Sequence, residues 1–486
     1  MSSEATIAVA PGAVGPVREK DRIHNLDMLR GWAILGILAV NAISFAWPVE
    51  LTMASAPPPG ALSLADQIGL WVTDVFFSDK FRTLFTMLFG VSVFLVGGER
   101  SDAERGRVLW RRLIWLGVFG VIHGMVFWYG DILFHYAYCG LLLMLMRSWK
   151  APRLLWIGGA ITLLWAVVAT LGYWGMENMP AEMAEQMKAG MPTADAASIA
   201  AAVDVYRSGW PAGLMENIKS WATFQLMASP FMIPITVPLM MVGLGLFKSG
   251  YLSGRAPMWS YLLVLVLGGA NLAAFALWGW QDMMAGEGAD PTGGLAAAAG
   301  GMAPLITLFY ATVLILLVRF GLKPLTRWLV PVGRMAFTNY LTQTLIMVTL
   351  YYAPWGPMWF GTHSPVEMWQ VVGAVWIAQL IWSPLWLSRF SMGPLEWLWR
   401  CLTYGRMVPI RKRGDGGRTD TVLDVEQREQ RHHRDRQLQQ EPREPGGHEI
   451  VREPQRPRPF RPRPWRDPQH ARPGPGFSLR HTGPKA

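Results

Sequence analysis

The chain has 486 residues, of which 51% are hydrophobic and 16% are charged, and its formal net charge is +10. This charged fraction is low for a soluble protein, and apolar runs of about 20 residues, long enough to cross a bilayer, recur along the first four hundred positions. The composition argues against an ordinary soluble enzyme and predicts an all-α, polytopic membrane bundle. Most of the excess Lys and Arg lies in short loops and the tail, where membrane orientation explains it, so nucleic acid is not an expected partner.

We expect about ten membrane-spanning helices. Their approximate ranges are 31–49, 81–98, 113–129, 132–147, 154–174, 224–247, 258–280, 302–320, 336–353 and 368–388. Lys and Arg are concentrated in alternate connections, at 18–30, 100–112, 147–153, 248–255, 323–334 and 389–413. The positive-inside rule then places both termini in the cytoplasm. No secretory cleavage site follows the first apolar run, so we expect an uncleaved helix there.

Three parts of the chain are expected. Residues 1–22 form a short cytoplasmic segment, and residues 23–410 form the bundle, with a long outer connection of amphipathic helical character at 175–221. Residues 411–486 are rich in Arg and Pro and contain hardly any aliphatic residues. Such a segment cannot bury enough apolar area to offset the entropy of ordering, so we expect a disordered cytoplasmic tail.

The first helix carries polar residues on one face. In LDMLRGWAILGILAVN, residues 26–41, Asp27 and Arg30 are one turn apart, and Asn41 lies three turns beyond Arg30 on nearly the same stripe. A helix surrounded by lipid would not be arranged so. The pattern indicates a face turned toward the interior of the bundle.

Two basic residues stand at the outer mouth of the second span, in DVFFSDKFRTLFTMLFG. The loop-charge rule disfavours Lys80 and Arg82 at that position. Each could pair with Asp74 or Asp79, hold an anionic group, or extend to the lipid headgroups.

The stretch HGMVFWYGDILFHYAYCG contains the richest group of ionisable residues. Each such group within a span costs about 2.5–3.5 kcal/mol on insertion scales, so His123, Asp131 and His135 should face an interior. An acid one turn from an imidazole can orient it and prepare a general base. Alternatively, Gly130 and Asp131 form a turn or helix cap while both histidines bond to neighbouring helices.

The ninth span and the segment after the tenth have simpler explanations. Asn339 and Gln343 in GRMAFTNYLTQTLI share a helix face, which suits hydrogen bonding between helices. The stretch SMGPLEWLWRCLTYG, residues 391–405, predicts a short amphipathic helix docked on the cytoplasmic end. The two cysteines, Cys139 and Cys401, have no spacing that indicates a disulfide framework or metal site.

In this order, these stretches resemble the YeiB-like family of bacterial inner-membrane proteins. The residues that carry the resemblance are LDMLRGWAILGILAVN, KFRTLFTMLFG, the stretch from His123 to Leu133, GRMAFTNYLTQ and GPLEWLWRCLTYG, within residues 22–406. The resemblance implies a multi-pass protein of the bacterial inner membrane. The family has no firmly assigned reaction.

The first part of that family is similar to a wider superfamily of transmembrane acyltransferases, among them O-antigen acetyltransferase-type proteins and the lysosomal heparan glucosaminide acetyltransferase. These pass an acyl group from cytoplasmic acyl-CoA to a hydroxyl or amine. In the O-antigen type, an arginine of the first helix is followed eleven residues later by a histidine. Arg30 matches the arginine, but Asn41 stands where the histidine would be, and Asn cannot accept a proton in the working pH range. Either the base has moved, with His123 as the candidate, or a ligand-binding cavity remains without the chemistry.

Acyl transfer is therefore the first functional hypothesis. His123 would deprotonate the acceptor, Asp131 would orient His123, and Asn41 would hydrogen-bond the acyl carbonyl. The candidate substrate-binding residues are Asp27, Arg30, Lys80, Arg82, His135, Asn339 and Gln343. The expected partners are membrane lipids, acyl-CoA as co-substrate and an envelope or small-molecule acceptor, with no bound cofactor or metal.

Two other hypotheses stay open. A transporter or flippase for a small anion, lipid or envelope precursor would use polar residues around a midplane cavity and broken helices such as SPFMIPITVP, residues 229–238. A non-catalytic membrane scaffold would recruit a cytoplasmic partner through residues 411–486.

Overall fold

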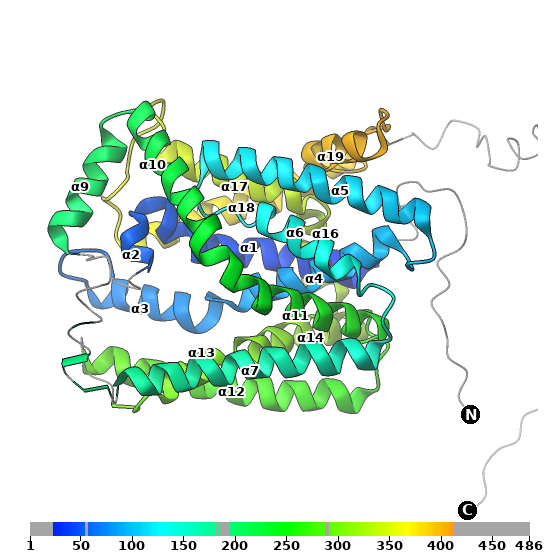
Figure 1. Ribbon diagram of the computed structural model, residues 1–486, viewed down its shortest axis with the longest axis horizontal. Helices are drawn as coiled ribbons and strands as arrows, with labels where there is room; N and C mark the ends of the chain where they lie inside the picture. The colour runs from blue at the N-terminus through cyan, green and yellow to red at the C-terminus, as the bar shows by residue number, and fades with distance from the viewer. Residues whose placement is uncertain are drawn as a thin grey trace, which may run out of the picture. The chain divides into compact units, whose positions relative to one another are not determined.

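The computed structural model describes residues 23–412 except 54–56, 178, 181, 184–185, 187–194 and 287–290. All regular elements in these ranges are helices, which confirms the all-α prediction (Figure 1). The first half contains α1 (His24–Ala46), α2 (Val49–Met53), α3 (Leu64–Val72), η2 (Thr73–Phe77), α4 (Lys80–Gly97), α5 (Ala103–Ile122), η3 (His123–Phe127), α6 (Leu133–Met144), α7 (Ala151–Glu177), α9 (Ala196–Arg207) and α10 (Trp210–Thr223).

The second half contains η4 (Phe224–Ala228), α11 (Ser229–Lys248), α12 (Met258–Ala285), α13 (Leu295–Gly301), α14 (Ala303–Arg319), α15 (Lys323–Thr326), α16 (Leu329–Arg334), α17 (Ala336–Tyr351), α18 (Pro365–Arg389) and α19 (Pro394–Tyr404). The elements named η are π-helical turns. All described helices belong to one unit, Met1–Arg413. The predicted N-terminal segment at 1–22 and almost all of the predicted tail lie outside the described residues.

Seven of the described helical segments are long and apolar enough to cross a membrane, and the number is eight if α13 and α14, bent by 58° at their junction, form one span. The expectation of about ten spans is therefore not confirmed. Two of the predicted spans, 132–147 and 336–353, coincide with the shorter helices α6 and α17, of 12 and 16 residues. Near the outer connection, the expected helical character is observed in α9 and α10.

Helices α7 and α12 expose apolar side chains. Only 11% of the apolar window of each is buried. Trp156 and Leu171 of α7 are 79% and 60% exposed, and Trp259 and Val266 of α12 are 67% and 68% exposed. Exposed apolar surface of this extent is rare on soluble monomers. With several such helices in one chain, the protein is a membrane protein, and α7 and α12 carry the apolar surface that contact with lipid requires.

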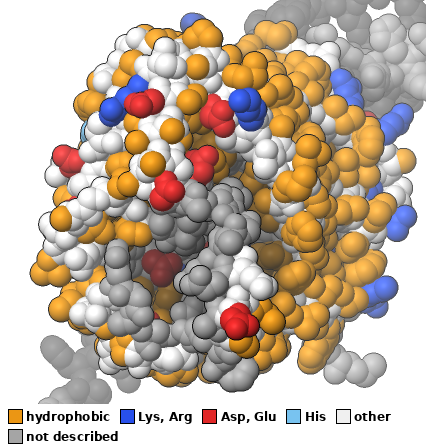
Figure 2. Space-filling model, turned by 60° about the vertical axis from the view of Figure 1, so that its left-hand side comes forward, with side chains coloured by type: hydrophobic (Ala, Val, Ile, Leu, Met, Phe, Trp, Pro, Cys, Tyr) orange, Lys and Arg blue, Asp and Glu red, His pale blue; other side chains and the backbone are white. Residues whose placement is uncertain are grey.

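The basic connections lie together at one end of the bundle. The backbone N–H of Arg100 donates to Ser148 Oγ (2.6 Å), and Lys248 Nζ donates to the carbonyl of Arg147 (2.7 Å). Helix α19 and the start of α5 lie at this end too (Figure 1). Figure 2 brings forward the opposite end, which holds α2, α3 and α9, and acidic side chains gather there. The connections that are rich in Lys and Arg thus lie at one end of the bundle, and acidic side chains gather at the other.

Glycines allow α4 and α11 to approach closely. A Cβ at Gly90 of α4 would overlap the carbonyl of Met240 on α11, and a Cβ at Gly243 of α11 would overlap the backbone of Met87 on α4. Small residues at such crossings let helix backbones pack tightly in membranes. This contact fixes α4, which carries Lys80, against the proline-containing helix α11.

We expect Gly90→Ala to destabilise the protein by about 1–3 kcal/mol, since the added methyl group forces α4 and α11 apart. The thermal unfolding midpoint in detergent measures this. Gly159→Ala on α7 is the matched control, because a Cβ there meets nothing within 4 Å. Equal midpoints for the two variants would contradict the close packing of α4 on α11.

Helix α19 is docked on the bundle as predicted, and its Glu396 caps α17. Glu396 Oε1 accepts from the backbone N–H groups of Phe337 (2.7 Å) and Thr338 (3.1 Å), and Oε2 accepts from Thr338 Oγ1 (2.5 Å). Trp399 Nε1 donates to the carbonyl of Arg112 on α5 (3.0 Å). Free N–H groups at a helix start attract a carboxylate, so α19 holds α5 and α17 together at the basic end.

Desolvation raises the pKa of Glu396, an effect that outweighs its hydrogen bonds. The native carboxyl then keeps its proton to higher pH than the unfolded chain does, so the wild type should lose stability as the pH rises above the ordinary glutamate range. Glu396→Gln has no carboxyl group to ionise at this position, so the variant should not lose this stability as the pH rises. We expect the thermal unfolding midpoint of the variant minus that of wild type to grow as the pH is raised from about 5 to about 8.

Glu104→Gln provides the control for this pH series, since Glu104 is exposed at the same end of the bundle. Its difference from wild type should stay nearly constant with pH. A difference for Glu396→Gln that stays flat or falls over the same range would refute a raised pKa.

Candidate functional site

The end of helix α5 places His123 beside Asp131 in the interior of the bundle. The α-helix changes at His123 into the π-helical turn η3, and the chain returns to begin α6 just after Asp131. His123 Nδ1 lies 2.8 Å from Asp131 Oδ1, and His123 Nε2 lies 3.0 Å from Thr344 Oγ1 on α17. The exposed fractions of these three residues are 2%, 0% and 2%. A hydroxyl, an imidazole and a carboxylate are thus joined in one buried chain of hydrogen bonds.

This arrangement fixes the orientation of the imidazole. The carboxylate of Asp131 accepts the Nδ1–H, which leaves a lone pair on Nε2 facing the hydroxyl of Thr344. Asp131 Oδ2 also accepts from the backbone N–H of Phe134 in the first turn of α6 (2.9 Å). Asp131 therefore caps a helix and orients a histidine at once, and the two interpretations of this stretch are compatible.

Two side chains hold the π-helical turn η3 from outside. Asn217 Nδ2 on α10 donates to the carbonyls of Gly124 (2.8 Å) and Met125 (2.9 Å), and Tyr352 Oη donates to the carbonyl of Phe127 (2.6 Å). A π-helical turn leaves carbonyls without their usual helical partners and often occurs at functional sites. The outer helix α10 thereby stabilises the position of His123.

His135 belongs to a different polar group. Its Nδ1 lies 2.8 Å from Ser229 Oγ and its Nε2 lies 2.8 Å from Thr236 Oγ1, both on α11. The acid that precedes it by one turn, Asp131, bonds to His123 instead. Asp131 thus pairs with His123, as in the acyl-transfer hypothesis, and not with His135, which bonds to a neighbouring helix.

In the part of the chain that the structure describes, the π-helical turns η2, η3 and η4 adjoin polar side chains. The turn η3 starts with His123, η4 ends next to Ser229, and η2 ends three residues before Lys80. Changes of helical pitch rotate the side chains that follow. The π-helical turns of this bundle therefore lie next to buried polar residues.

Asn339 and Gln343 form the interhelical hydrogen bonds predicted for them. Gln343 Nε2 donates to Gln379 Oε1 on α18 (2.9 Å) and to the carbonyl of Ile34 on α1 (3.2 Å). Asn339 Nδ2 donates to Ser383 Oγ on α18 (3.0 Å). The exposed fractions of Asn339 and Gln343 are 0% and 2%, so both serve helix packing in this structure.

The polar face of α1 lies in a separate place. Arg30 donates to Asp27 Oδ1 (3.1 Å) and to Ser92 Oγ on α4 (2.8 Å), at the basic end. Asn41 is half-buried and lies eleven residues further along α1, about 16 Å from Arg30 along the helix axis. Both ring nitrogens of His123 are bonded to other residues, so no hydrogen bond joins His123 to Asn41.

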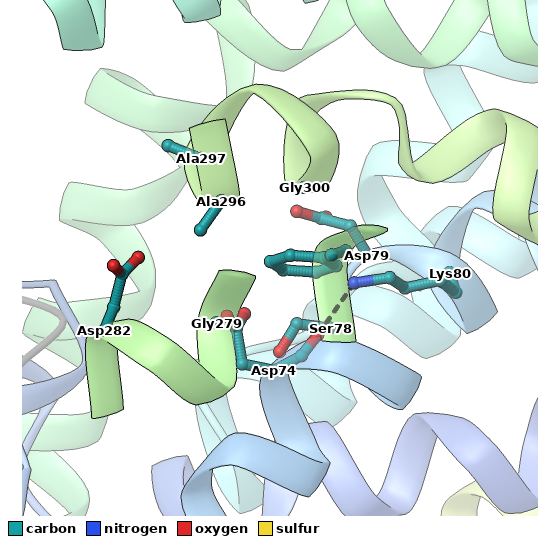
Figure 3. Close-up of a pocket in the computed structure, with 10 residues that line it drawn as sticks. Asp74, Ser78, Asp79, Lys80, Gly279, Asp282, Ala296, Ala297 and Gly300 are labelled. Atoms are coloured by element: carbon teal, nitrogen blue, oxygen red, sulfur yellow. Dashed lines mark hydrogen bonds between the residues drawn. The ribbon is translucent and has the colours of Figure 1, made fainter. Parts of the chain in front are cut away.

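Lys80 and Arg82 also take different positions. Arg82 pairs with Asp79 one turn away (2.7 Å). Lys80 is 2% exposed and lines a pocket (Figure 3). The candidate residues therefore fall into several groups, in one of which His123 is joined to Asp131 and Thr344.

Sequence reasoning did not select Thr344, Asn217, Ser229 or Gln379 as site residues. Thr344 follows Gln343 directly in the polar run TNYLTQT, and that run was the available signal. The other three lie on helices whose contacts depend on tertiary packing, which one sequence does not give.

Comparison with known proteins identifies the family. A family model described as "Protein of unknown function (DUF418)" matches residues 246–406. The chain is 32% identical over 404 residues to "Uncharacterized protein YeiB" of Escherichia coli (strain K12), covering 79% of this chain and 96% of the relative. The chain belongs to the DUF418 family. This DUF418 protein is also 30% identical over 425 residues to "Uncharacterized protein YxaH" of Bacillus subtilis (strain 168), covering 82% of this chain and 98% of the relative.

The family assignment confirms the YeiB-like resemblance found from the five motifs. No solved structure matches the chain. The DUF418 model covers the end of α11 through α19, which includes Thr344 and Glu396 but neither His123 nor Asp131.

We expect Asn217→Ala to destabilise this DUF418 protein by about 1–3 kcal/mol, because the carbonyls of Gly124 and Met125 lose their buried donor. Hydrogen–deuterium exchange should rise in η3 and the first residues of α6. Glu216→Ala is the control, since it removes only a surface ion pair with Lys219 (3.3 Å), worth about 0–1 kcal/mol. Unchanged exchange around His123 in Asn217→Ala would show that α10 does not hold η3.

Proposed function

We propose that this membrane protein is an acyltransferase of the bacterial inner membrane, with His123 as general base. The observation that carries the proposal is the buried chain of hydrogen bonds from Thr344 Oγ1 through His123 to Asp131 Oδ1. A carboxylate that accepts from Nδ1 holds the imidazole in the tautomer that can take a proton at Nε2. The similarity of the first part of the family to membrane acyltransferases supports the same chemistry, with the base moved from the position of Asn41 to His123.

In the proposed reaction, the acceptor hydroxyl takes the place of the Thr344 hydroxyl at His123 Nε2. His123 removes the hydroxyl proton while the oxygen attacks the carbonyl carbon of the acyl-CoA thioester. The carbon–sulfur bond then breaks, and the thiolate leaves with the proton that His123 returns. Asp131 stabilises the imidazolium between these two proton transfers.

The basic end of the bundle suits an anionic donor. Under the positive-inside rule this end faces the cytoplasm, which places residue 23 and α19 on the cytoplasmic side. The phosphates of acyl-CoA would meet basic residues there, including Arg30 of the family motif. Transfer would then run from the basic end toward His123 along the interior of the bundle.

The test compares acyl transfer from radiolabelled acetyl-CoA to envelope material in membranes that contain wild type, His123→Gln or Asp131→Asn. We expect each variant to lose about 100-fold or more of the activity, because general acid–base catalysis contributes about 10²–10⁴-fold. Thr344→Val should keep part of the activity, since Thr344 occupies the acceptor position without taking the proton.

His24→Gln is the matched control, because His24 is exposed at the start of α1 and should leave the transfer rate unchanged. Expression and unfolding midpoints establish that the variants fold. Full activity in folded His123→Gln would exclude His123 as the base.

Transport is a second candidate, favoured by the broken helices. Pro234 and Pro238 lie inside α11, and α13 meets α14 at 58°. Helices interrupted in this way form binding sites in many transporters. Flux of a solute into proteoliposomes without any acylated product would favour this function over acyl transfer.

A further inference from the structure

A pocket separate from the His123 group lies where α4 begins. It has a volume of about 400 Å³ and is lined by η2, the start of α4, the end of α12 and α13. Its polar lining comes from Asp74, Ser78, Asp79, Lys80 and Asp282. Figure 3 shows Lys80 and Asp282 on opposite sides of the pocket, with Asp74 between them on the same wall as Ser78.

The Lys80 amine is built into the wall and keeps donor capacity. Its side chain is 2% exposed, and Nζ donates to the backbone carbonyl of Asp74 (2.7 Å) and lies 4.5 Å from the ring centre of Phe275. An ammonium group has three N–H donors, and one of them is used by this carbonyl. The others can donate to an oxygen atom in the pocket.

Among the described residues that line the pocket, carboxylates outnumber cations. Asp79 pairs with Arg82 (2.7 Å), which offsets its charge. Asp74 and Asp282 then oppose the single ammonium of Lys80. A free anion would meet this excess of negative charge, whereas a cation would relieve it.

Asp282 gives the second indication of a ligand. Its Oδ2 accepts from Thr292 Oγ1 (3.0 Å), but its Oδ1 is buried and has no hydrogen-bond partner among the described residues. A buried carboxylate oxygen without a donor is costly and rarely left so. A donor that enters the pocket would satisfy it.

We propose that this pocket binds a small ligand that carries an ammonium group and, a few bonds away, an oxygen acceptor, as an amino alcohol does. The ammonium group donates to Asp282 Oδ1 and lies near Asp74, while the oxygen accepts from Lys80 Nζ. A free amino alcohol and the headgroup of an ethanolamine lipid share this chemistry. The site is independent of the proposed acyl transfer, because it uses neither His123 nor Asp131.

The first experiment titrates the full chain in lipid-free detergent with ethanolamine, ethylamine, acetate or phosphate at constant ionic strength. The thermal unfolding midpoint should rise most with ethanolamine, less with ethylamine, which lacks the oxygen, and not with either anion. A rise with acetate or phosphate and none with ethanolamine would overturn the proposal, as would the absence of a rise with any amine.

Variants of the residues that line the pocket test whether ethanolamine binds there. Asp282→Asn should weaken the apparent affinity for ethanolamine about tenfold, since a hydrogen bond between charged groups is lost. Lys80→Met should reduce the preference for ethanolamine over ethylamine to about one. Asp204→Asn on α9 is the matched control, because it removes one exposed carboxylate at the same end of the bundle. Equal affinities for Asp282→Asn and Asp204→Asn would place the amine elsewhere and refute the site.

Lipid nanodiscs distinguish the two sources of the ligand. If the ethanolamine headgroup occupies the pocket, nanodiscs of phosphatidylethanolamine should abolish the midpoint rise with free ethanolamine, and nanodiscs of phosphatidylglycerol should retain it. A rise retained in both assigns the pocket to a free amine. His123→Gln should respond to ethanolamine like wild type, so failure of the acyltransferase proposal leaves this test intact.

Discussion

The interior of this bundle depends on one constraint: a polar group in a region without water must find its partner within the protein. His123, Asp131 and Thr344 meet this constraint together, and in doing so they join η3, the start of α6 and α17. Each of the three would be costly alone. As a set they fix α17 against η3 and the start of α6, which lie about 220 residues earlier in the chain.

The same constraint explains the hydrogen bonds that surround His123, Asp131 and Thr344. The carbonyls released by the π-helical turn η3 are taken up by Asn217 and Tyr352. Gln343, next to Thr344 on α17, is fixed by Gln379 and by the backbone of α1. The hydrogen bonds that hold the helices together therefore belong to the same network as those that fix the imidazole of His123.

The sequence predicts the fold better than it predicts the site. Apolar runs locate most of the long helices, and loop charges correctly group the basic connections at one end. The number of spans was not confirmed, because apolar composition does not show whether a helix such as α6 is long enough to cross or is shielded by its neighbours. The acyl-transfer hypothesis paired Asp131 with His123, but the spacing along the chain also allowed His135, and tertiary packing selects between the two. The spacing of residue types along the sequence also does not predict the π-helical turns, because the change in helical pitch depends on tertiary contacts.

The short helix α6 has a consequence for the surrounding bilayer. Its 12 residues extend for about 18 Å, whereas a hydrocarbon core is about 30 Å thick. Asp131 lies just before the start of α6, and residues 128–132 between η3 and α6 form no helix. Hydrophobic mismatch of this kind is relieved by local thinning of the membrane. Thinning of the membrane beside α6 would bring the membrane surface closer to the buried His123.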